Sequence, residues 1–231
     1  MPKRVAILQS NYIPWKGYFD IIHDVDEFIF LDDVQYTPQD WRNRNRIKTA
    51  QGAVWLTIPV GSRDDRRICD VELPPAWGQA HWRKIESAYA TAPYFAAYRA
   101  FFETVYLESE WKYLSDLNQH LVRRIASEIL GITTRFRDSR EIESQGRKQE
   151  RLLNLLRRAG ATSYVSGPAA KDYIEPARFR EAGIDLVWKD YSGYPPYPQF
   201  HPPFVHDVTI LDLLFHTGPD APRYIWGWRS R

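Results

Sequence analysis

The sequence is poor in the features that mark several large classes of protein. Among its 231 residues there is one cysteine, Cys69, which excludes an internal disulfide and a metal site built from several cysteines. No apolar run approaches the roughly 20 residues that a membrane-spanning helix needs, and the first residues show no signal-peptide pattern. These absences predict a soluble, cytoplasmic protein without a membrane span.

Net charge and familiar motifs are lacking as well. With 31 Lys and Arg against 29 Asp and Glu, the chain carries a formal charge of only +2, so we expect no nucleic-acid partner. Neither GxGxxG nor the phosphate-binding GxxxxGKS/T is present, so an ordinary dinucleotide or P-loop site is unsupported. A GxSxG elbow and HxxxH spacing are also absent, and we expect no serine-hydrolase or metal site. No motif identifies a cofactor.

Aromatic residues, by contrast, are abundant. Nine Trp, fourteen Tyr and eleven Phe make up 15% of the chain. Such side chains fill hydrophobic cores, and Trp and Tyr also line clefts for sugars and nucleotides, because each has an apolar face and one polar group. A small-molecule cleft rich in aromatic side chains is therefore one expectation.

Short apolar runs alternate with helical patterns along the chain. The runs at 5–8 and 28–31 flank a helical pattern through Phe19 and Ile22, which predicts a βαβ unit with parallel strands. Further strands are expected at 47–60 as a hairpin, and at 68–73, 132–136, 163–166 and 184–188. Helices are expected near 77–89, 94–106, 114–129, 152–156 and 208–214.

This alternation predicts an α/β fold. We expect a Rossmann-like parallel sheet in the N-terminal part, with helical additions from about Trp77 to Gly131. The strands near Val165 and Val187 should extend that sheet or pack beside it. The pattern indicates a single domain over 1–231, with a candidate subdomain junction near 138–149. The proline- and aromatic-rich run 194–203 resembles a linker or a polyproline ligand, but we favour an ordered crossing segment because its aromatic side chains need burial.

Two loops should meet at the carboxyl edge of the predicted parallel strands, where open α/β sheets bind ligands. The loop after 5–8 offers Gln9, Asn11, Tyr12 and Trp15 as substrate-binding residues. The Pro-x-x-Gly spacing in this loop also resembles that of HxGH-type nucleotidyltransferases, although Trp and Tyr replace both histidines. The second strand leads directly into Asp32 and Asp33, which could bind a divalent metal or serve as a general base, and we take Asp33 as the catalytic candidate.

After Asp33 the chain alternates arginine and asparagine, Arg42-Asn43-Arg44-Asn45-Arg46. In an extended segment the three arginines share one face and the asparagines the other. We expect the arginine face to turn inward toward Asp33, with Arg44 and Arg46 binding the oxygens of a phosphorylated ligand. The alternative is a solvated loop whose arginines pair with Asp32, Asp33 and Asp40.

A histidine on the first helix of the helical section completes the candidate site. His81 is spaced with Ile85 and Tyr89 at i, i+4 and i+8, and could act as a catalytic acid or base. The alternative is a structural histidine among apolar neighbours. We expect one pocket to collect the catalytic candidates Asp33 and His81 with the substrate-binding candidates Gln9, Asn11, Tyr12, Trp15, Arg44 and Arg46.

These residues resemble the WbqC-like protein family. The matching text is Ile-Leu-Gln-Ser-Asn-Tyr-Ile-Pro-Trp-Lys-Gly-Tyr-Phe at 7–19, Asp-Asp-Val-Gln-Tyr at 32–36, Trp-Arg-Asn-Arg-Asn-Arg-Ile at 41–47, Trp-Leu-Thr-Ile-Pro-Val at 55–60, Tyr-Pro-Gln at 197–199 and Asp-Leu-Leu-Phe at 212–215. The match runs over nearly the whole chain and is very specific in the first third. Ser10 departs from it, because the family usually has proline there, and His206-Asp207 departs where a serine is common.

The resemblance implies a role in O-antigen or other surface-polysaccharide biosynthesis. It implies an acyltransferase or aminoacyltransferase that forms an amide on a nucleotide-linked amino sugar, with an acyl or aminoacyl carrier protein as a candidate donor. Arginines would hold the diphosphate, and a carboxylate or His81 would deprotonate the amine. The alternatives are a non-catalytic binding or scaffold protein of a biosynthetic complex, and an ATP-using ligase or nucleotidyltransferase-like enzyme.

Overall fold

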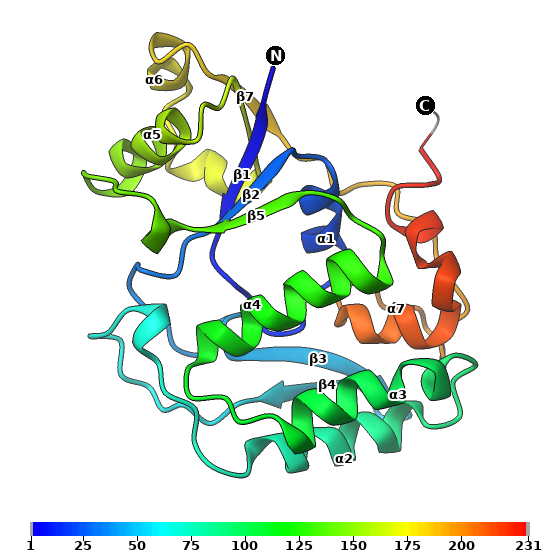
Figure 1. Ribbon diagram of the computed structural model, residues 1–231. Helices are drawn as coiled ribbons and strands as arrows, with labels where there is room; N and C mark the ends of the chain where they lie inside the picture. Colours follow the sequence, from blue (N-terminus) through cyan, green and yellow to red (C-terminus); the bar gives the residue numbers. More distant parts are fainter. Residues whose placement is uncertain (1, 230–231) are drawn as a thin grey trace.

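The computed structural model describes residues 2–229 and is built around a five-stranded parallel sheet (Figure 1). Its strands are β1 (Arg4–Leu8), β2 (Glu27–Phe30), β5 (Arg135–Asp138), β6 (Ser163–Ser166) and β7 (Asp185–Trp188). They lie in the order β5-β2-β1-β6-β7, and every pair is parallel. The predicted Rossmann-like α/β fold is confirmed, and the strands near Val165 and Val187 extend the same sheet.

Strand β1 lies at the centre because its residues can be buried on both faces. Val5 and Ile7 belong to one hydrophobic cluster, whereas Ala6, between them, belongs to the other. Ile29 on β2 joins Val5 and Ile7, while Phe28 joins Ala6. This two-residue alternation explains why the strands appear in the sequence as continuous apolar runs, as in other parallel sheets.

Helices cover both faces of the sheet (Figure 1). Helices α5 (Lys148–Arg158) and α6 (Pro176–Glu181) pack on the face that carries Val5. Helices α1 (Lys16–His23) and α4 (Leu114–Arg124) contribute to the cluster on the other face. The three-layer arrangement leaves the carboxyl ends of the strands open to loops.

A second region of the molecule adjoins α4. It contains the antiparallel hairpin of β3 (Arg44–Thr49) and β4 (Gly52–Thr57), together with α2 (Trp77–Tyr89), α3 (Phe95–Glu103) and α7 (Ile210–Thr217). In Figure 1 its hairpin and α2 lie below α4 and its helix α7 lies to the right of α4. The predicted hairpin and helical additions are thus present. Short π-helical segments, Thr104–Glu108 and Ile125–Ile129, continue α3 and α4. Turns of 3-10 helix lie at Ile68–Asp70, Ser139–Glu141, Pro168–Asp172 and Gly218–Tyr224.

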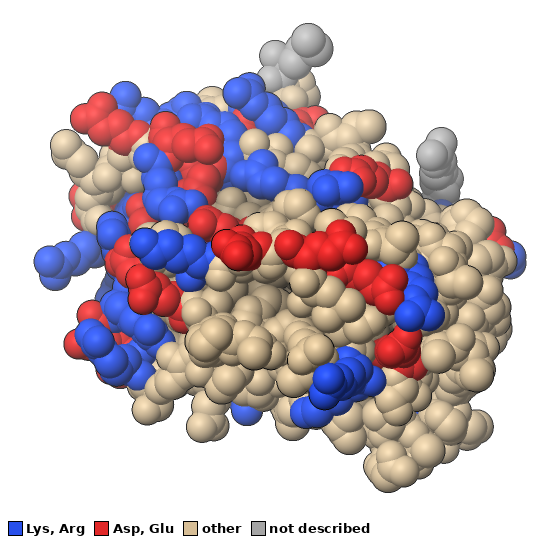
Figure 2. All heavy atoms as spheres, turned by 60° about the horizontal axis from the view of Figure 1, so that its bottom comes forward, with Lys and Arg blue, Asp and Glu red and all other residues tan. Residues whose placement is uncertain are grey.

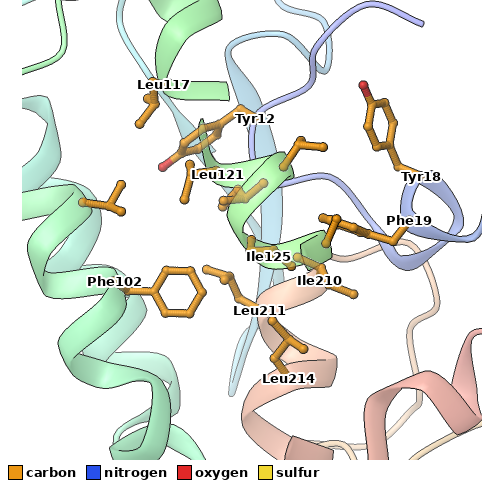
Figure 3. Close-up of a cluster of buried hydrophobic side chains, with 14 of the residues drawn as sticks. Tyr12, Tyr18, Phe19, Phe102, Leu117, Leu121, Ile125, Ile210, Leu211 and Leu214 are labelled. Carbon is orange, nitrogen blue, oxygen red and sulfur yellow. The ribbon is translucent and has the colours of Figure 1, made fainter. Parts of the chain in front are cut away.

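One large core joins the parallel sheet and its helices α1 and α4 to this second region (Figure 3). Tyr12 and Phe19, from the N-terminal region, belong to the same cluster as Leu121 of α4, Phe102 of α3 and Leu211 of α7. All five side chains are fully buried. Because the core is continuous between the sheet and the second region, it supports the prediction of a single domain. The single domain and the subdomain junction near 138–149 stay predictions.

The expected strand at 68–73 is wrong. This segment forms a 3-10 turn at Ile68–Asp70, and its backbone N–H groups are used by the loop after β2. Ile68 N–H donates to Val34 O at 3.0 Å, and Cys69 N–H donates to Asp32 O at 2.9 Å. The segment therefore fastens the loop that follows β2, and a short apolar run alone does not distinguish this role from a strand.

The proline- and aromatic-rich segment is ordered, as its composition favoured. Tyr194 and Tyr197 are buried, and Tyr197 Oη donates to Asp212 Oδ1 on α7 at 2.6 Å. The ammonium of Lys16 lies 4.9 Å from the centre of the Tyr194 ring and 5.3 Å from that of Tyr197. Burial lowers the pKa of Lys16 to about 8, against the effect of ring faces that favour its charged form.

A fully buried carboxylate on α1 holds the beginning of this segment. Asp20 on α1 accepts from Arg229 Nη1 at 2.9 Å and forms an ion pair with Lys189 at 2.9 Å. Tyr194 Oη also donates to it. Asp20 has no exposed surface, so its charge is balanced within the fold.

Candidate functional site

The carboxyl edge of the parallel sheet carries a cavity at the position where the strand order changes direction. Strands after β1 are added first on the β2 side and then on the β6 side, and loops separate at such a switch point. A cavity of about 480 Å³ lies there, and we call it the switch-point cavity. Its lining includes Gln9, Val34, Lys148, Gln149, Arg151, Tyr164, Ser166, Gly167 and Tyr173.

The switch-point cavity combines an apolar base with polar groups at one side. Ile7 and Leu8 supply aliphatic surface, Tyr164 and Tyr173 supply rings, and Lys148 and Arg151 of α5 supply positive charge. Apolar lining with a few convergent polar groups is typical of small-molecule pockets, and its volume lies within the usual range of about 300–1,000 Å³.

Asp33 does not line this cavity, but it pairs with Arg151, which does. Its carboxylate forms an ion pair with Arg151 and accepts from Ser139 Oγ at 2.6 Å. Asp33 was expected to pair with Arg42, Arg44 and Arg46, which we call the arginine row, and this expectation is wrong. The contacts of Asp33 are with Ser139, just after β5, and with Arg151 of α5, whereas Arg44 and Arg46 lie on β3 of the hairpin. Asp33 positions a cavity-lining guanidinium in this structure.

A second cavity, of about 310 Å³, lies beside the first loop. We call it the tryptophan cavity, and its lining is Asn11, Pro14, Trp15, Trp41, Asn45 and Asp207. Trp15 is held edge-to-face against Tyr191, with ring centres 5.3 Å apart. Trp41 is 40% exposed and lies 5.6 Å from the Trp55 ring. Two indole rings and the amide of Asn11 in one lining suit the apolar and hydroxyl groups of a sugar.

Arg42 lies between the two cavities. Its guanidinium donates to Gln9 Oε1, which belongs to the switch-point cavity, and to Asn11 Oδ1 at 3.3 Å, which belongs to the tryptophan cavity. Asp40 is 3.2 Å away. Arg42 belongs to the same alternating segment as Arg44 and Arg46, the two arginines expected to bind substrate, but it is Arg42 that lies at the junction.

Arginine and asparagine side chains do point to opposite faces of the segment 42–46, but the face that is buried is not the expected one. Asn43 and Asn45 face the interior, and Asn45 Nδ2 donates to the carbonyls of Tyr12 at 3.1 Å and Ile13 at 2.9 Å. Buried loop carbonyls need donors, and a neutral amide can be buried at lower cost than a guanidinium. The inward face is therefore the asparagine face.

Arg44 and Arg46 lie on the opposite face of the hairpin, beside an exposed tryptophan. Their guanidinium carbons are 4.3 Å and 5.4 Å from the centre of the Trp55 ring. Arg46 also pairs with Asp207 at the rim of the tryptophan cavity. Arg46 thus adjoins the candidate site through Asp207, whereas Arg44 stacks outside it.

Tyr12 and His81 lie together in the core. His81 Nε2 lies 3.1 Å from Thr57 O and therefore donates to it, which leaves Nδ1 as the acceptor for Tyr12 Oη at 2.8 Å. Tyr12 Oη in turn accepts from Tyr106 Oη at 2.8 Å. Neither Tyr12 nor His81 lines either cavity.

Burial sets the protonation state of this chain of groups. It lowers the pKa of His81 to about 4, so the imidazole is neutral at neutral pH. Burial also raises the pKa of Tyr106 above its ordinary range. The expected gathering of His81 with Asp33 and the loop residues in one pocket is not what the structure has, because the apolar helix face carries His81 inward.

Asp32 links the loops that form the site. It is fully buried, accepts from Ser10 N–H at 2.8 Å and from Gln119 Nε2 at 2.8 Å. Gln119 Nε2 also donates to Asp138 Oδ2 at 2.6 Å. Burial raises the pKa of Asp32. This network joins the loops after β1 and β2 to the end of β5, and so fixes the backbone that presents Gln9 and Asn11.

Comparison with known proteins places the chain in a family. A model of the WbqC-like protein family matches residues 9–224, nearly the whole chain. The chain belongs to the WbqC-like protein family. The match begins at Gln9, the first residue of the loop that borders both cavities.

A mycobacterial relative of this WbqC-like protein has nearly the same length. The chain is 48% identical over 226 residues to the "Uncharacterized protein Rv1507c" of Mycobacterium tuberculosis (strain ATCC 25618 / H37Rv), covering 96% of this chain and 97% of that protein. No solved structure matches the chain. The family model and the relative establish family membership and name no activity.

Other surface features fit the composition. On the face of the WbqC-like protein shown in Figure 2, acidic and basic side chains are interspersed and leave a wide uncharged area. Within 2–229, no helix is long and apolar enough to cross a membrane. The same residues hold no cluster of three or more His, Cys, Asp or Glu that could bind a metal ion.

Several residues of the switch-point cavity carry no sequence motif. Arg151 and Lys148 lie on the ordinary amphipathic helix α5, and Tyr173 follows a 3-10 turn. Ser166-Gly167 offered the one available signal, since small residues directly after a parallel strand allow close approach of a ligand.

Proposed function

We propose that this WbqC-like protein is a transferase that binds a nucleotide-linked amino sugar and joins an acyl or aminoacyl group to its amine. The observation that carries the proposal is the switch-point cavity and its neighbour, the tryptophan cavity, on either side of Arg42. The biosynthesis of a surface polysaccharide such as O-antigen is the setting that we propose, because amino sugars are acylated there.

The lining of the cavities supports this class of ligand. Tyr173, which is 68% exposed, supplies ring surface for a base, and Arg151 supplies a donor for ribose or phosphate oxygens. Trp15 and Trp41 supply stacking surface for a pyranose. The 480 Å³ and 310 Å³ volumes suit a ligand with a larger and a smaller end.

The proposed reaction is amide formation from a thioester donor, for example one on an acyl or aminoacyl carrier protein. The sugar amine attacks the thioester carbonyl and a C–N bond forms; the C–S bond breaks with its electron pair leaving on sulfur, so the carrier departs as a thiolate that is protonated to the thiol, and the amine loses a proton. Asp207 lines the tryptophan cavity and is 63% exposed on its side chain, so its carboxylate can attract the amine and accept that proton. In this proposal Asp33 acts through Arg151, and His81 supports the loop from the core.

Arg151→Met is expected to lower affinity for a nucleotide-linked amino sugar by about 10- to 100-fold, because a charge-assisted hydrogen bond contributes about 1.5–3 kcal/mol. Titration calorimetry with uridine-, thymidine- and guanosine-diphosphate-linked amino sugars measures this. Arg157→Met is the matched control, since Arg157 is exposed on the same helix. Equal affinities for the two variants would remove Arg151 from the proposed site.

Incubation with a glycyl- or acyl-carrier thioester and the bound nucleotide sugar is expected to add the acyl mass to the sugar, as measured by mass spectrometry. Asp207→Asn should slow this transfer at least tenfold while the sugar still binds. Binding without transfer from any donor would indicate a non-catalytic binding or scaffold protein. Transfer from a free acid with release of pyrophosphate from ATP would indicate an ATP-using ligase.

A further inference from the structure

We propose that Arg42 is the anion-binding centre that joins the two cavities into one site. A ligand that fills both cavities then carries its anionic group, a phosphate or diphosphate, between two uncharged parts. This inference rests on the proposed function for the identity of the two ends, and on the contacts of Arg42 for its centre.

Two of the three present partners of the Arg42 guanidinium are uncharged, and the third is one carboxylate. The uncharged partners are amide oxygens, those of Gln9 and Asn11. The carboxylate of Asp40 is 3.2 Å from Nη1, and its side chain is 30% exposed. A guanidinium has five N–H donors, so three contacts leave donors free. Phosphate oxygens, which accept two parallel bonds, are the better partners.

The backbone around Arg42 is fixed in advance. The carbonyl of Arg42 accepts from Asn118 Nδ2 of α4 at 2.8 Å, and the carbonyl of Trp41 accepts from Tyr12 N–H at 2.9 Å. The Arg42 side chain is 14% exposed, so it is largely buried but keeps some contact with solvent. Fixing the residue before the ligand arrives lowers the ordering cost of binding.

When the ligand binds, the Arg42 guanidinium exchanges its present partners for the anionic group of the ligand. Phosphate oxygens replace the amide oxygens of Gln9 and Asn11 on the guanidinium. The freed carboxamides lie on the two cavities and can donate N–H to the two ends of the ligand. One arginine thereby couples occupation of the switch-point cavity to occupation of the tryptophan cavity.

The other arginines of the row are engaged elsewhere. Arg44 lies on the Trp55 ring, and Arg46 pairs with Asp207. Arg44→Met therefore removes one positive charge two residues away while leaving the junction intact. It is a matched control for Arg42→Met in charge, side-chain length and position on the segment.

Inorganic pyrophosphate tests the anion site without any assumption about the organic ends. Wild type and Arg44→Met are expected to bind it with affinities within threefold of each other, as measured by calorimetry. Arg42→Met should bind it about 10- to 100-fold more weakly. Arg42→Met binding as well as wild type, or Arg44→Met losing as much, would overturn the inference.

Gln9→Glu is a second variant that keeps the arginine, in case Arg42→Met does not fold. Its carboxylate has the shape of the amide and pairs with the guanidinium, so pyrophosphate affinity should again fall at least tenfold. Circular dichroism and thermal unfolding establish that each variant is folded. Unchanged pyrophosphate affinity in folded Gln9→Glu would count against Arg42 as the anion centre.

Nucleotide sugars separate this inference from the proposed function. If a nucleotide-linked amino sugar binds wild type and Arg42→Met equally, the anion centre is refuted and the proposed ligand stands. If pyrophosphate depends on Arg42 but no nucleotide sugar binds, the anion centre stands and the proposed ligand is wrong. If neither pyrophosphate nor any nucleotide sugar binds wild type, both fall.

Discussion

Replacing Asp20 with alanine is expected to lower the free energy of unfolding by about 3–5 kcal/mol, because removing one partner of a buried ion pair leaves the other charge uncompensated. Asp20 is fully buried and balances both Lys189, which is itself buried, and Arg229. The loss also frees the hydroxyl of Tyr194. Urea unfolding at pH 7, followed by circular dichroism, measures the change.

Asp65→Ala is the control for this prediction. Asp65 is also paired with an arginine, Arg63 at 3.0 Å, but both side chains are exposed, and solvent-exposed pairs contribute little to stability. We expect its unfolding curve to overlay that of wild type. An Asp20→Ala variant with the same small effect would mean that water reaches Lys189 and solvates it, and the buried network would then carry little of the stability.

Acid is expected to destabilise the protein through His81. Its pKa is about 4 in the folded protein and about 6.5 in an unfolded chain. Between these values the unfolded state binds a proton that the folded state does not, so the free energy of unfolding falls as pH decreases from about 6.5 to about 4. The full contribution is roughly 3 kcal/mol, from 1.36 kcal/mol for each pKa unit.

The variant His81→Gln isolates this contribution, because glutamine keeps one acceptor for Tyr12 and one donor for Thr57 but does not titrate. Its stability should fall less than that of wild type between pH 6.5 and pH 4. His201→Gln, at an exposed position, is the control and should follow wild type. Parallel pH curves for wild type and His81→Gln would show that His81 is protonated in the folded state.

The fold was accessible from the sequence where local patterns and burial agree. The apolar runs of β1 and β2 are buried on both faces, so a run of apolar residues was a sufficient signal for a parallel strand. The 3-10 turn at Ile68–Asp70 has a similar apolar composition, but its N–H groups bond to the loop after β2. Hydrogen-bond partners that are remote in sequence cannot be read from a short window.

The candidate site was accessible in part for the same reason. Parallel strands send their loops to one edge, and this rule placed Gln9, Asn11 and Trp15 at the cavities. It could not show which arginine would lie between those cavities. That depended on the loop carbonyls of Tyr12 and Ile13, which draw Asn45 inward.

The sequence by itself determined the family, the parallel sheet and the alternation of arginine with asparagine, since each depends on residue identity and local period. The tertiary structure decided which face of that alternation is buried, which arginine meets Gln9 and Asn11, and that Asp33 holds Arg151. These outcomes depend on the cost of burying charge against particular neighbours. Those neighbours come from α4, α5 and the first loop, which only folding brings to the same edge.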